Sequence, residues 1–274
     1  MPSSRSKKVF WGILIVIILG LLTAIFFYFS TKTKPVPETP AAVETAFTAF
    51  SIGTSVQGRN IEAITFGQGE KHLIFIGGIH GGYEWNSVSL AKQFISYLKA
   101  NPSLIPTNLK ITVIPSLNPD GVAKGTEASA RFNANNVDLN RNFDCQWQAT
   151  STWRTQIVSA GASAFSEPEA KALRDFVLKT NPNLVLFWHS QANKVYASGC
   201  GSIFPVSLEI AKLYSRASSY PVAEAFTDYA ITGDAGDWLA SIKIPAISVE
   251  LKNHTDLDWS ENLAGTKALI EYYR

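Results

Sequence analysis

Two short segments of the sequence place metal-binding side chains directly after runs of apolar residues. His80 and Glu84 follow the apolar stretch 73–76, with two glycines and one tyrosine between them, and His189 follows the apolar stretch 184–188. Two histidines and one glutamate form the ligand set of catalytic rather than structural zinc. Either segment alone is typical of an ordinary strand end, so it is the combination that points to a metal.

A further polar residue lies in an apolar setting. Glu250 is enclosed by Ile-Ser-Val before it and Leu after it. Burying a carboxylate is costly unless the group is paired or has a role. The residues leave two interpretations open: an ion pair with a nearby Lys or Arg, or a general base beside a metal.

These side chains must be positioned by strands and helices. Strand-like segments at 50–54, 61–66, 73–76, 110–115, 184–188 and 246–251 are interspersed with helical patterns at 85–100, 166–180, 206–218 and from 261 onward. We therefore expect an α/β domain with a mixed, mostly parallel central sheet flanked by helices. Residues 166–169 (Ser-Glu-Pro-Glu) predict a capping box at a helix start, and residues 118–121 (Asn-Pro-Asp-Gly) predict a turn.

The N-terminal region has a different composition. Residues 9–29 contain no charge, follow three basic residues, and would span about 31 Å as a helix, close to the thickness of a bilayer core. We expect a cytoplasmic basic tail (1–8), a transmembrane signal anchor (9–29), a Pro-rich linker (30–45) and an extracytoplasmic catalytic domain (46–274). A cleaved signal peptide is the alternative.

The net charge of +2 is carried by the N-terminal region. Five of the 24 Lys and Arg residues and none of the 22 Asp and Glu residues precede residue 35, so the remainder has a net charge of −3. A mildly acidic domain argues against nucleic acid as a partner.

The segments around the polar residues resemble the zinc metallocarboxypeptidases of the carboxypeptidase A and B type, in a compact bacterial form. The resemblance runs from about residue 50 to the C-terminus. It rests on residues 77–80 (Gly-Gly-Ile-His), 118–121, 137–143 (Val-Asp-Leu-Asn-Arg-Asn-Phe), 189–190 (His-Ser) and 248–251 (Ser-Val-Glu-Leu). Residues 118–121 and 137–143 are the most specific of these matches.

The resemblance implies one Zn²⁺ per chain, held by His80, Glu84 and His189. It also implies that Asp138 orients His80 through the other ring nitrogen. Glu250 would be the general base, taking a proton from zinc-bound water and later passing it to the leaving amine.

The same resemblance implies how a peptide with a free C-terminal carboxylate is bound. Arg131 would stabilise the tetrahedral oxyanion. Asn140 and Arg141 would clamp the terminal carboxylate, and Tyr229 would close over it. Asp234 and Gly236 would lie near the substrate side chain, leaving space and a negative charge that suit lysine or diaminopimelate.

The sequence departs from the family at one ligand. The family usually has two residues between its first His and Glu, whereas His80 and Glu84 are separated by three, and Gly81-Gly82 could absorb the extra residue. The other two histidines, His72 and His254, match nothing in the pattern, and we expect them to be structural or surface residues.

Cys145 and Cys200 are the only cysteines, and each follows one of the expected active-site motifs. In an exported domain they can form a disulfide that braces the two loops.

We therefore expect a membrane-anchored zinc exopeptidase that removes the C-terminal residue of a peptide, such as a cell-wall stem peptide. Two alternatives remain open on the sequence. One is a related zinc deacylase of N-acyl amino acids, which would use the same carboxylate clamp. The other is a non-catalytic binding module with the same fold.

Overall fold

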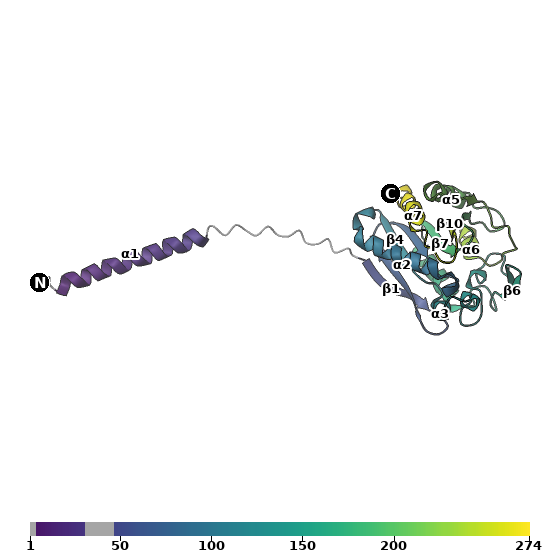
Figure 1. Cartoon of the computed structure of the whole chain (residues 1–274), viewed down its shortest axis with the longest axis horizontal. Coiled ribbons are helices and arrows are strands. Elements are labelled where there is room, and N and C mark those ends of the chain that lie inside the picture. Colours follow the sequence, from purple (N-terminus) through teal and green to yellow (C-terminus); the bar gives the residue numbers. More distant parts are fainter. Residues whose placement is uncertain (1–3, 31–46) are drawn as a thin grey trace. The chain divides into compact units, whose positions relative to one another are not determined.

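The computed structural model describes residues 4–30 and 47–274. The chain divides into two units, Met1–Glu44 and Thr45–Arg274, which are described separately (Figure 1). The expected linker, apart from Ser30, and the first three residues of the expected basic tail lie outside the described residues.

The first unit contains a single described element, the helix α1 (Ser4–Ser30). Its segment Trp11–Ser30 is long and apolar enough to cross a membrane, and none of it is buried against other residues. A membrane anchor and a signal sequence both fit these properties.

The second unit is built around an eight-stranded mixed sheet in the order β1-β2-β4-β3-β7-β10-β8-β9 (Figure 1). The strands are β1 (Phe47–Thr54), β2 (Asn60–Phe66), β3 (Lys71–Ile76), β4 (Leu109–Ile114), β7 (Leu184–Ser190), β8 (Lys194–Ala197), β9 (Val222–Ala223) and β10 (Ala246–Leu251). The central strands β4, β3, β7 and β10 are parallel to one another. The expected α/β class with a mixed sheet is therefore confirmed.

Helices cover both faces of this sheet. They are α2 (Trp85–Ala100), α4 (Pro168–Thr180), α5 (Pro205–Ser218), α6 (Ala235–Ser241) and α7 (Trp259–Tyr272). Successive strand residues point to opposite faces, so Phe75 packs in one core with α2, α5 and α7, whereas Ile74 packs in a second core with α4 and α6. Because both faces are covered, every residue of β7 is buried.

The remaining elements lie in the loops. They are α3 (Pro119–Ala123), the 3₁₀ turns η1 (Gly81–Glu84), η2 (Pro102–Leu104), η3 (Ala128–Arg131) and η4 (Leu139–Arg141), and a separate hairpin of β5 (Thr150–Trp153) and β6 (Gln156–Ser159). The predicted turn at 118–121 is in fact the start of α3, where the Asn118 side chain accepts a hydrogen bond from the Gly121 backbone.

The predicted capping box at the start of α4 is wrong. The N-cap residue is Glu167, which makes no capping hydrogen bond. The Ser166 hydroxyl bonds to Glu167 and Asn142 instead, and Glu169 accepts a hydrogen bond from the backbone N–H of Val56 on the β1–β2 loop. The side chains of Ser166 and Glu169 are therefore engaged with other partners and do not form the local cap.

Candidate metal centre and active site

The three expected metal ligands meet at the carboxyl ends of β3 and β7. His80 Nδ1 lies 2.7 Å from Glu84 Oε1, His189 Nδ1 lies 3.1 Å from Glu84 Oε2, and the two Nδ1 atoms are 3.3 Å apart. Two zinc ligands, each about 2.0–2.1 Å from the metal in tetrahedral geometry, are roughly 3.3 Å apart. The nitrogen and oxygen donors are buried and converge on one point, so the site fits a single Zn²⁺.

The glycines between His80 and Glu84 absorb the extra residue in this loop. Gly81 has a φ of +52°, and a Cβ on Gly82 would lie 1.8 Å from the carbonyl oxygen of Gly125. The backbone therefore turns tightly through η1 and presses against the segment beyond α3. The longer spacing still brings Glu84 to the metal centre.

Asp138 lies behind the metal centre and is completely buried. Its carboxylate accepts a hydrogen bond of 2.8 Å from Arg131 Nε and lies 3.4 Å from His80 Nε2. Burial would raise the pKa of Asp138, but the neighbouring cations Arg131 and Arg141 hold it well below its usual range. The ionised carboxylate is therefore placed to orient the imidazole of His80.

Glu250 lies beside the metal centre through the register of the sheet. In the parallel pairing of β10 with β7, Glu250 is the direct partner of His189. Burial, and then the charge of Glu84, raise the pKa of Glu250 to about 7, against the opposing effect of His189. A carboxylate with a pKa near neutrality in such a place has the properties of a general base.

Arg131 is held at the inner wall of the site. Besides Asp138, its guanidinium lies 3.5 Å from Glu84 Oε1 and 4.8 Å from the centroid of the Trp153 ring. Burial would raise the pKa of Glu84, but the nearby His80 and His189 keep it below its usual range. The guanidinium of Arg131 thus lies directly beside the expected metal ligand Glu84.

Three of the four expected substrate-binding residues, Asn140, Arg141 and Asp234, line one cleft of about 570 Å³ together with the metal ligands and Glu250, whereas Gly236 does not line it. Asn140 Nδ2 donates a hydrogen bond of 2.7 Å to Asp234 Oδ2, and Arg141 Nη2 donates to the Thr152 carbonyl at 3.2 Å. Asp234 also caps α6 by accepting from Gly236 N at 2.8 Å. Gly236 itself is buried in the first turn of α6, where a Cβ would lie 2.5 Å from Ser198 Oγ.

Tyr229 also lines this cleft. Burial raises the pKa of Tyr229, against the lowering effects of Arg141, Arg131 and a hydrogen bond from the backbone of Arg154. Its phenol ring packs edge-on against Phe226, with centroids 4.7 Å apart. The tyrosine therefore bridges the loop before α6 and the turn of the β5–β6 hairpin.

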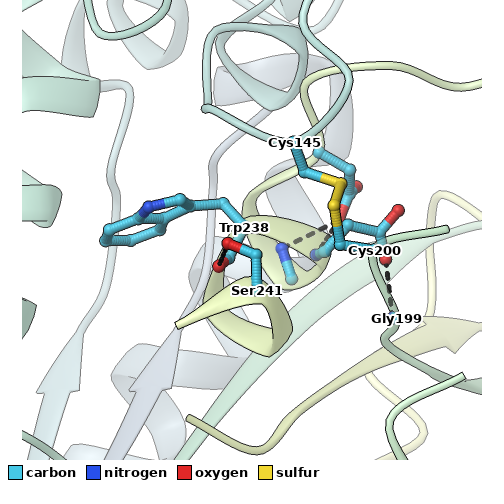
Figure 2. The surroundings of a disulfide bond; sticks show 8 residues. Cys145, Gly199, Cys200, Trp238 and Ser241 are labelled. Atoms are coloured by element: carbon cyan, nitrogen blue, oxygen red, sulfur yellow. Dashed lines mark hydrogen bonds between the residues drawn. A yellow bond between two sulfur atoms is a disulfide. The ribbon is translucent and has the colours of Figure 1, made fainter. Parts of the chain in front are cut away.

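Cys145 and Cys200 form a disulfide with a Cα–Cα distance of 5.9 Å (Figure 2). Gly199, which precedes Cys200, donates its backbone N–H to Asp237 Oδ1 at 2.9 Å. The Cys145 carbonyl accepts a hydrogen bond from Gly233 N, also at 2.9 Å. The disulfide thus joins the loop that follows Asn140 and Arg141 to the loop of Gly199 and Gly201, which also lines the cleft.

Sequence reasoning missed several residues of this cleft. Asp237 lines it, and burial together with Asp234 raises the pKa of Asp237 to about 7. Trp153 and Arg154 line it from the β5–β6 hairpin, and Tyr83 lines it from η1. The hairpin has no alternating apolar pattern, but the Asp-x-x-Asp spacing at 234–237 was a signal that the sequence offered.

His72 and His254 have the roles of packed rather than ligating residues. His72 is buried and its Nε2 lies 2.8 Å from Thr112 Oγ1. His254 Nδ1 lies 2.8 Å from Ser190 Oγ, directly after the ligand His189, and its ring packs on Tyr83 with centroids 4.7 Å apart. His254 therefore supports the rim of the metal centre.

The sheet, the buried His–Glu–His cluster and the adjoining cleft define a zinc-dependent hydrolase of the α/β class. A family model described as zinc carboxypeptidase matches residues 39–207, which is more than half of the chain. The chain belongs to this family, and Zn²⁺ is the metal that the family implies for His80, Glu84 and His189.

Similar proteins include enzymes named for bacterial cell-wall peptides. Murein peptide amidase A of Vibrio campbellii (strain ATCC BAA-1116) is 30% identical over 175 residues, which cover 60% of this chain and 66% of the relative. Gamma-D-glutamyl-L-diamino acid endopeptidase 1 of Lysinibacillus sphaericus is 26% identical over 75% of this chain and 60% of the relative. The chain thus spans 60% to 66% of the length of these two relatives.

Solved structures show the same fold. The murein-tripeptide amidase MpaA from Escherichia coli O157 is 26% identical, with a TM-score of 0.64, and the match covers 86% of this chain and 96% of that one. Carboxypeptidase A from Helicoverpa armigera is 22% identical, with a TM-score of 0.66, over 83% of this chain and 67% of the other.

Proposed function

We propose that the protein is a zinc-dependent exopeptidase that removes a C-terminal diamino acid from cell-wall stem peptides. The observation that carries the proposal is the convergence of His80, Glu84 and His189 with Glu250 in a cleft that also contains Arg141. Relatives named for murein peptides and for γ-D-glutamyl-diamino acid bonds support the substrate class.

Asn140 and Arg141 are the proposed binding residues for the terminal carboxylate. Arg141 is fixed by backbone carbonyls rather than by a carboxylate, because its Nη1 donates to the Asn140 carbonyl at 2.7 Å and its Nη2 to Thr152. Its planar guanidinium therefore keeps its charge available for an incoming anion. Tyr229, at the same end of the cleft, would close over the bound residue.

Glu250 and Arg131 would act in the chemical step together with the metal. Bound zinc would supply Lewis acidity toward the substrate carbonyl and would make water a stronger acid. Glu250 would take the proton of the attacking water and deliver it to the departing amine. Arg131 would stabilise the negative charge that develops on the carbonyl oxygen.

The preference for a diamino acid follows from the acidic wall of the cleft. The acidic residues are Asp234 and Asp237 at the start of α6, together with Glu224 and Asp228 in the loop before α6. A second amino group on the leaving residue would be attracted to these carboxylates. An aromatic side chain would gain nothing from them.

We further propose that α1 anchors the enzyme in a membrane, with the second unit on the extracytoplasmic side. The basic residues before residue 9 favour retention of that end inside. A disulfide beside the cleft is suited to an oxidising compartment. The test is to find whether the mature chain retains α1: N-terminal sequencing of membrane-extracted protein should recover a residue before Val9, and a start after Ser30 would show cleavage.

The activity test uses full-length protein in detergent with peptides that end in lysine, diaminopimelate or phenylalanine, and an N-acyl amino acid. We expect cleavage of the lysine and diaminopimelate peptides. A strong preference for phenylalanine would overturn the substrate class, and turnover of the N-acyl amino acid alone would identify a deacylase. Zinc binding without any turnover would favour a binding module.

A further inference from the structure

The indole ring of Trp153 lies against the guanidinium group of Arg131. The guanidinium carbon of Arg131 is 4.8 Å from the centroid of the Trp153 ring, within the range of a cation–π contact. Arg154 also approaches this ring, but at the longer distance of 5.6 Å. Trp153 and Arg131 both line the cleft together with the expected metal ligands. A tryptophan that no step of the proposed mechanism uses therefore contacts a cation on which that mechanism depends.

Arg131 is held along its edge by two carboxylates. Its Nε donates to Asp138 Oδ2 at 2.8 Å, and its Nη1 lies 3.5 Å from Glu84 Oε1. Contacts at the edge of a planar guanidinium fix the bonded atoms, but they allow the plane to tilt about the line that joins them. Because the ring of Trp153 lies close to the guanidinium carbon, it restricts such a tilt.

The Trp153 side chain is itself fixed in place. The residue is only 6% exposed. Its ring packs edge-on against Tyr83 and Phe132, with centroids 5.3 Å and 6.0 Å away. Tyr83 belongs to η1, the turn that ends at Glu84, and Phe132 directly follows Arg131 in the chain. Edge-on ring pairs are favourable beyond the area that they bury. The indole therefore cannot rotate without disturbing both of these segments.

The residue before Trp153 contacts the second cation of the proposed mechanism. The Thr152 carbonyl accepts a hydrogen bond of 3.2 Å from Arg141 Nη2. Two adjacent residues of β5 thus contact Arg131 and Arg141, one through its side chain and the other through its backbone. In a peptide, only three bonds of about 1.3–1.5 Å each separate the scissile carbonyl carbon from the terminal carboxylate carbon. Two cations that act on these groups must keep a fixed spacing, and one strand that contacts both is suited to set it.

From these contacts, and resting on the proposed function, we infer that Trp153 is a positioning residue that holds Arg131 in the orientation needed to stabilise the tetrahedral oxyanion. The charge of the oxyanion develops only in the transition state, so a displaced guanidinium lowers kcat more than it changes KM. A small displacement is sufficient, because such stabilisation depends on precise geometry. Trp153 acts through Arg131 and takes no part in proton transfer.

The test is a double-mutant cycle between Trp153 and Arg131. Full-length protein in detergent is assayed with a peptide from the activity test that the wild type cleaves. Trp153→Leu should lower kcat about 10-fold and change KM less than about 2-fold. Trp153→Phe retains an aromatic ring and should have an intermediate kcat. In the Arg131→Gln background, Trp153→Leu should lower kcat less than about 2-fold, because the cation that the ring orients is absent.

A binding measurement gives a second readout that does not depend on turnover. A phosphinic analogue of the same peptide has an anionic tetrahedral group in place of the scissile amide, and its affinity is measured by isothermal titration calorimetry. Trp153→Leu should weaken binding of this analogue about 10-fold. The affinity for the released amino acid, which lacks that group, should stay within about 2-fold of wild type. Zinc content and the urea denaturation midpoint are measured for each variant.

Trp147→Leu is the matched control. Trp147 lies between Cys145 and β5, its Nε1 donates to the Ala160 carbonyl at 3.0 Å, and it is not among the residues that line the cleft. This variant makes the same chemical change in the same region of the chain. It should leave kcat and the affinity for the phosphinic analogue unchanged.

The inference is overturned if Trp153→Leu lowers kcat equally with Arg131 present and in the Arg131→Gln background, or if it weakens the released amino acid as much as the analogue; the proposed function then stands. If Trp153→Leu does not fold, the same cycle with Trp153→Phe decides, with an expected fall in kcat of about 3-fold that disappears in the Arg131→Gln background. A wild type that cleaves no peptide with a free C-terminus overturns the proposed function and the inference together.

Discussion

Glu250 and His189 are direct partners across the parallel strands β10 and β7. Paired residues of neighbouring strands point to the same side of a sheet, so the expected general base and a metal ligand are held side by side by backbone hydrogen bonds. The two residues are 61 positions apart in sequence, and the pairing of the two strands holds them next to each other. A slip of one residue in this pairing would turn one of the two side chains away.

The first prediction concerns Glu250 itself. Glu250→Gln retains the shape of the side chain but cannot accept the proton of water, so we expect kcat to fall about 10²- to 10⁴-fold. Zinc content, measured by atomic absorption, should remain one per chain. Glu209→Gln on the exposed face of α5 is the control. Unchanged turnover in Glu250→Gln would remove Glu250 from the mechanism.

The second prediction concerns the support of the metal ligand His80. Asp138→Asn retains the size of the side chain but removes the charge that faces His80 Nε2 and Arg131. We expect zinc affinity to fall about 10- to 100-fold, measured by competition with a chelator of known affinity. Asp175 is exposed on α4, and the control variant Asp175→Asn should behave as wild type. Equal affinities in the two variants would show that Asp138 does not support the ligand.

The third prediction concerns recognition of the terminal carboxylate. Arg141→Met should lower kcat/KM for a peptide with a free C-terminus by about 10²-fold, because two charge-assisted hydrogen bonds are lost. The same variant should lose its discrimination against the C-terminal amide of that peptide. The measurement is the steady-state kinetics of both proteins with the free-acid peptide and its amide. If Arg141→Met still prefers the free acid, another residue binds the terminal carboxylate.

The fourth prediction concerns the disulfide. Cys145 and Cys200 are 55 residues apart, and closing such a loop stabilises a chain by about 4 kcal/mol in the chain-entropy model. The double variant Cys145→Ser/Cys200→Ser should lose a comparable amount in urea denaturation. Because the bridge also joins two loops that contribute residues to the cleft, KM should rise more than kcat falls. An unaltered denaturation midpoint would contradict this expectation.

The fifth prediction concerns stability and pH. Burial, and then the charge of Lys110, lower the pKa of His72 from 6.5 to about 4. Between these values the unfolded chain binds a proton that the folded chain does not, so stability falls as the pH drops from 6.5 to 4, by about 3 kcal/mol. The stability of wild type relative to His72→Gln should therefore decrease across this range. Parallel curves for the two proteins would exclude His72 as the cause.

Much of the fold could be predicted because its central strands are continuous apolar runs with polar residues at their ends. His80, His189 and Glu250 all follow or end such runs, and the order of strands and helices implied the parallel block. The zinc carboxypeptidase family was recognisable from short motifs near these residues, and the family match confirms it.

Other parts of the site depend on contacts that no local pattern records. The β5–β6 hairpin is short and largely polar, so Trp153 and Arg154 carried no signal of their position beside the metal centre. Asp237 lies in the first turn of α6, where acidic residues are common because they interact favourably with the helix dipole. Its position in the sequence therefore did not indicate a place in the cleft. The failed capping box at Ser166 shows the same limit, because its partners come from residues distant in sequence.

The backbone packing of the ligand loop has a consequence for sequence variation within the family. Gly82 touches the carbonyl of Gly125, and Gly81 packs against Gly121 and Ala130. A side chain at either position cannot be accommodated unless the opposing segment changes as well. Relatives that share the longer His-to-Glu spacing should therefore retain the glycine pair, and any replacement there should covary with the length or composition of residues 121–130.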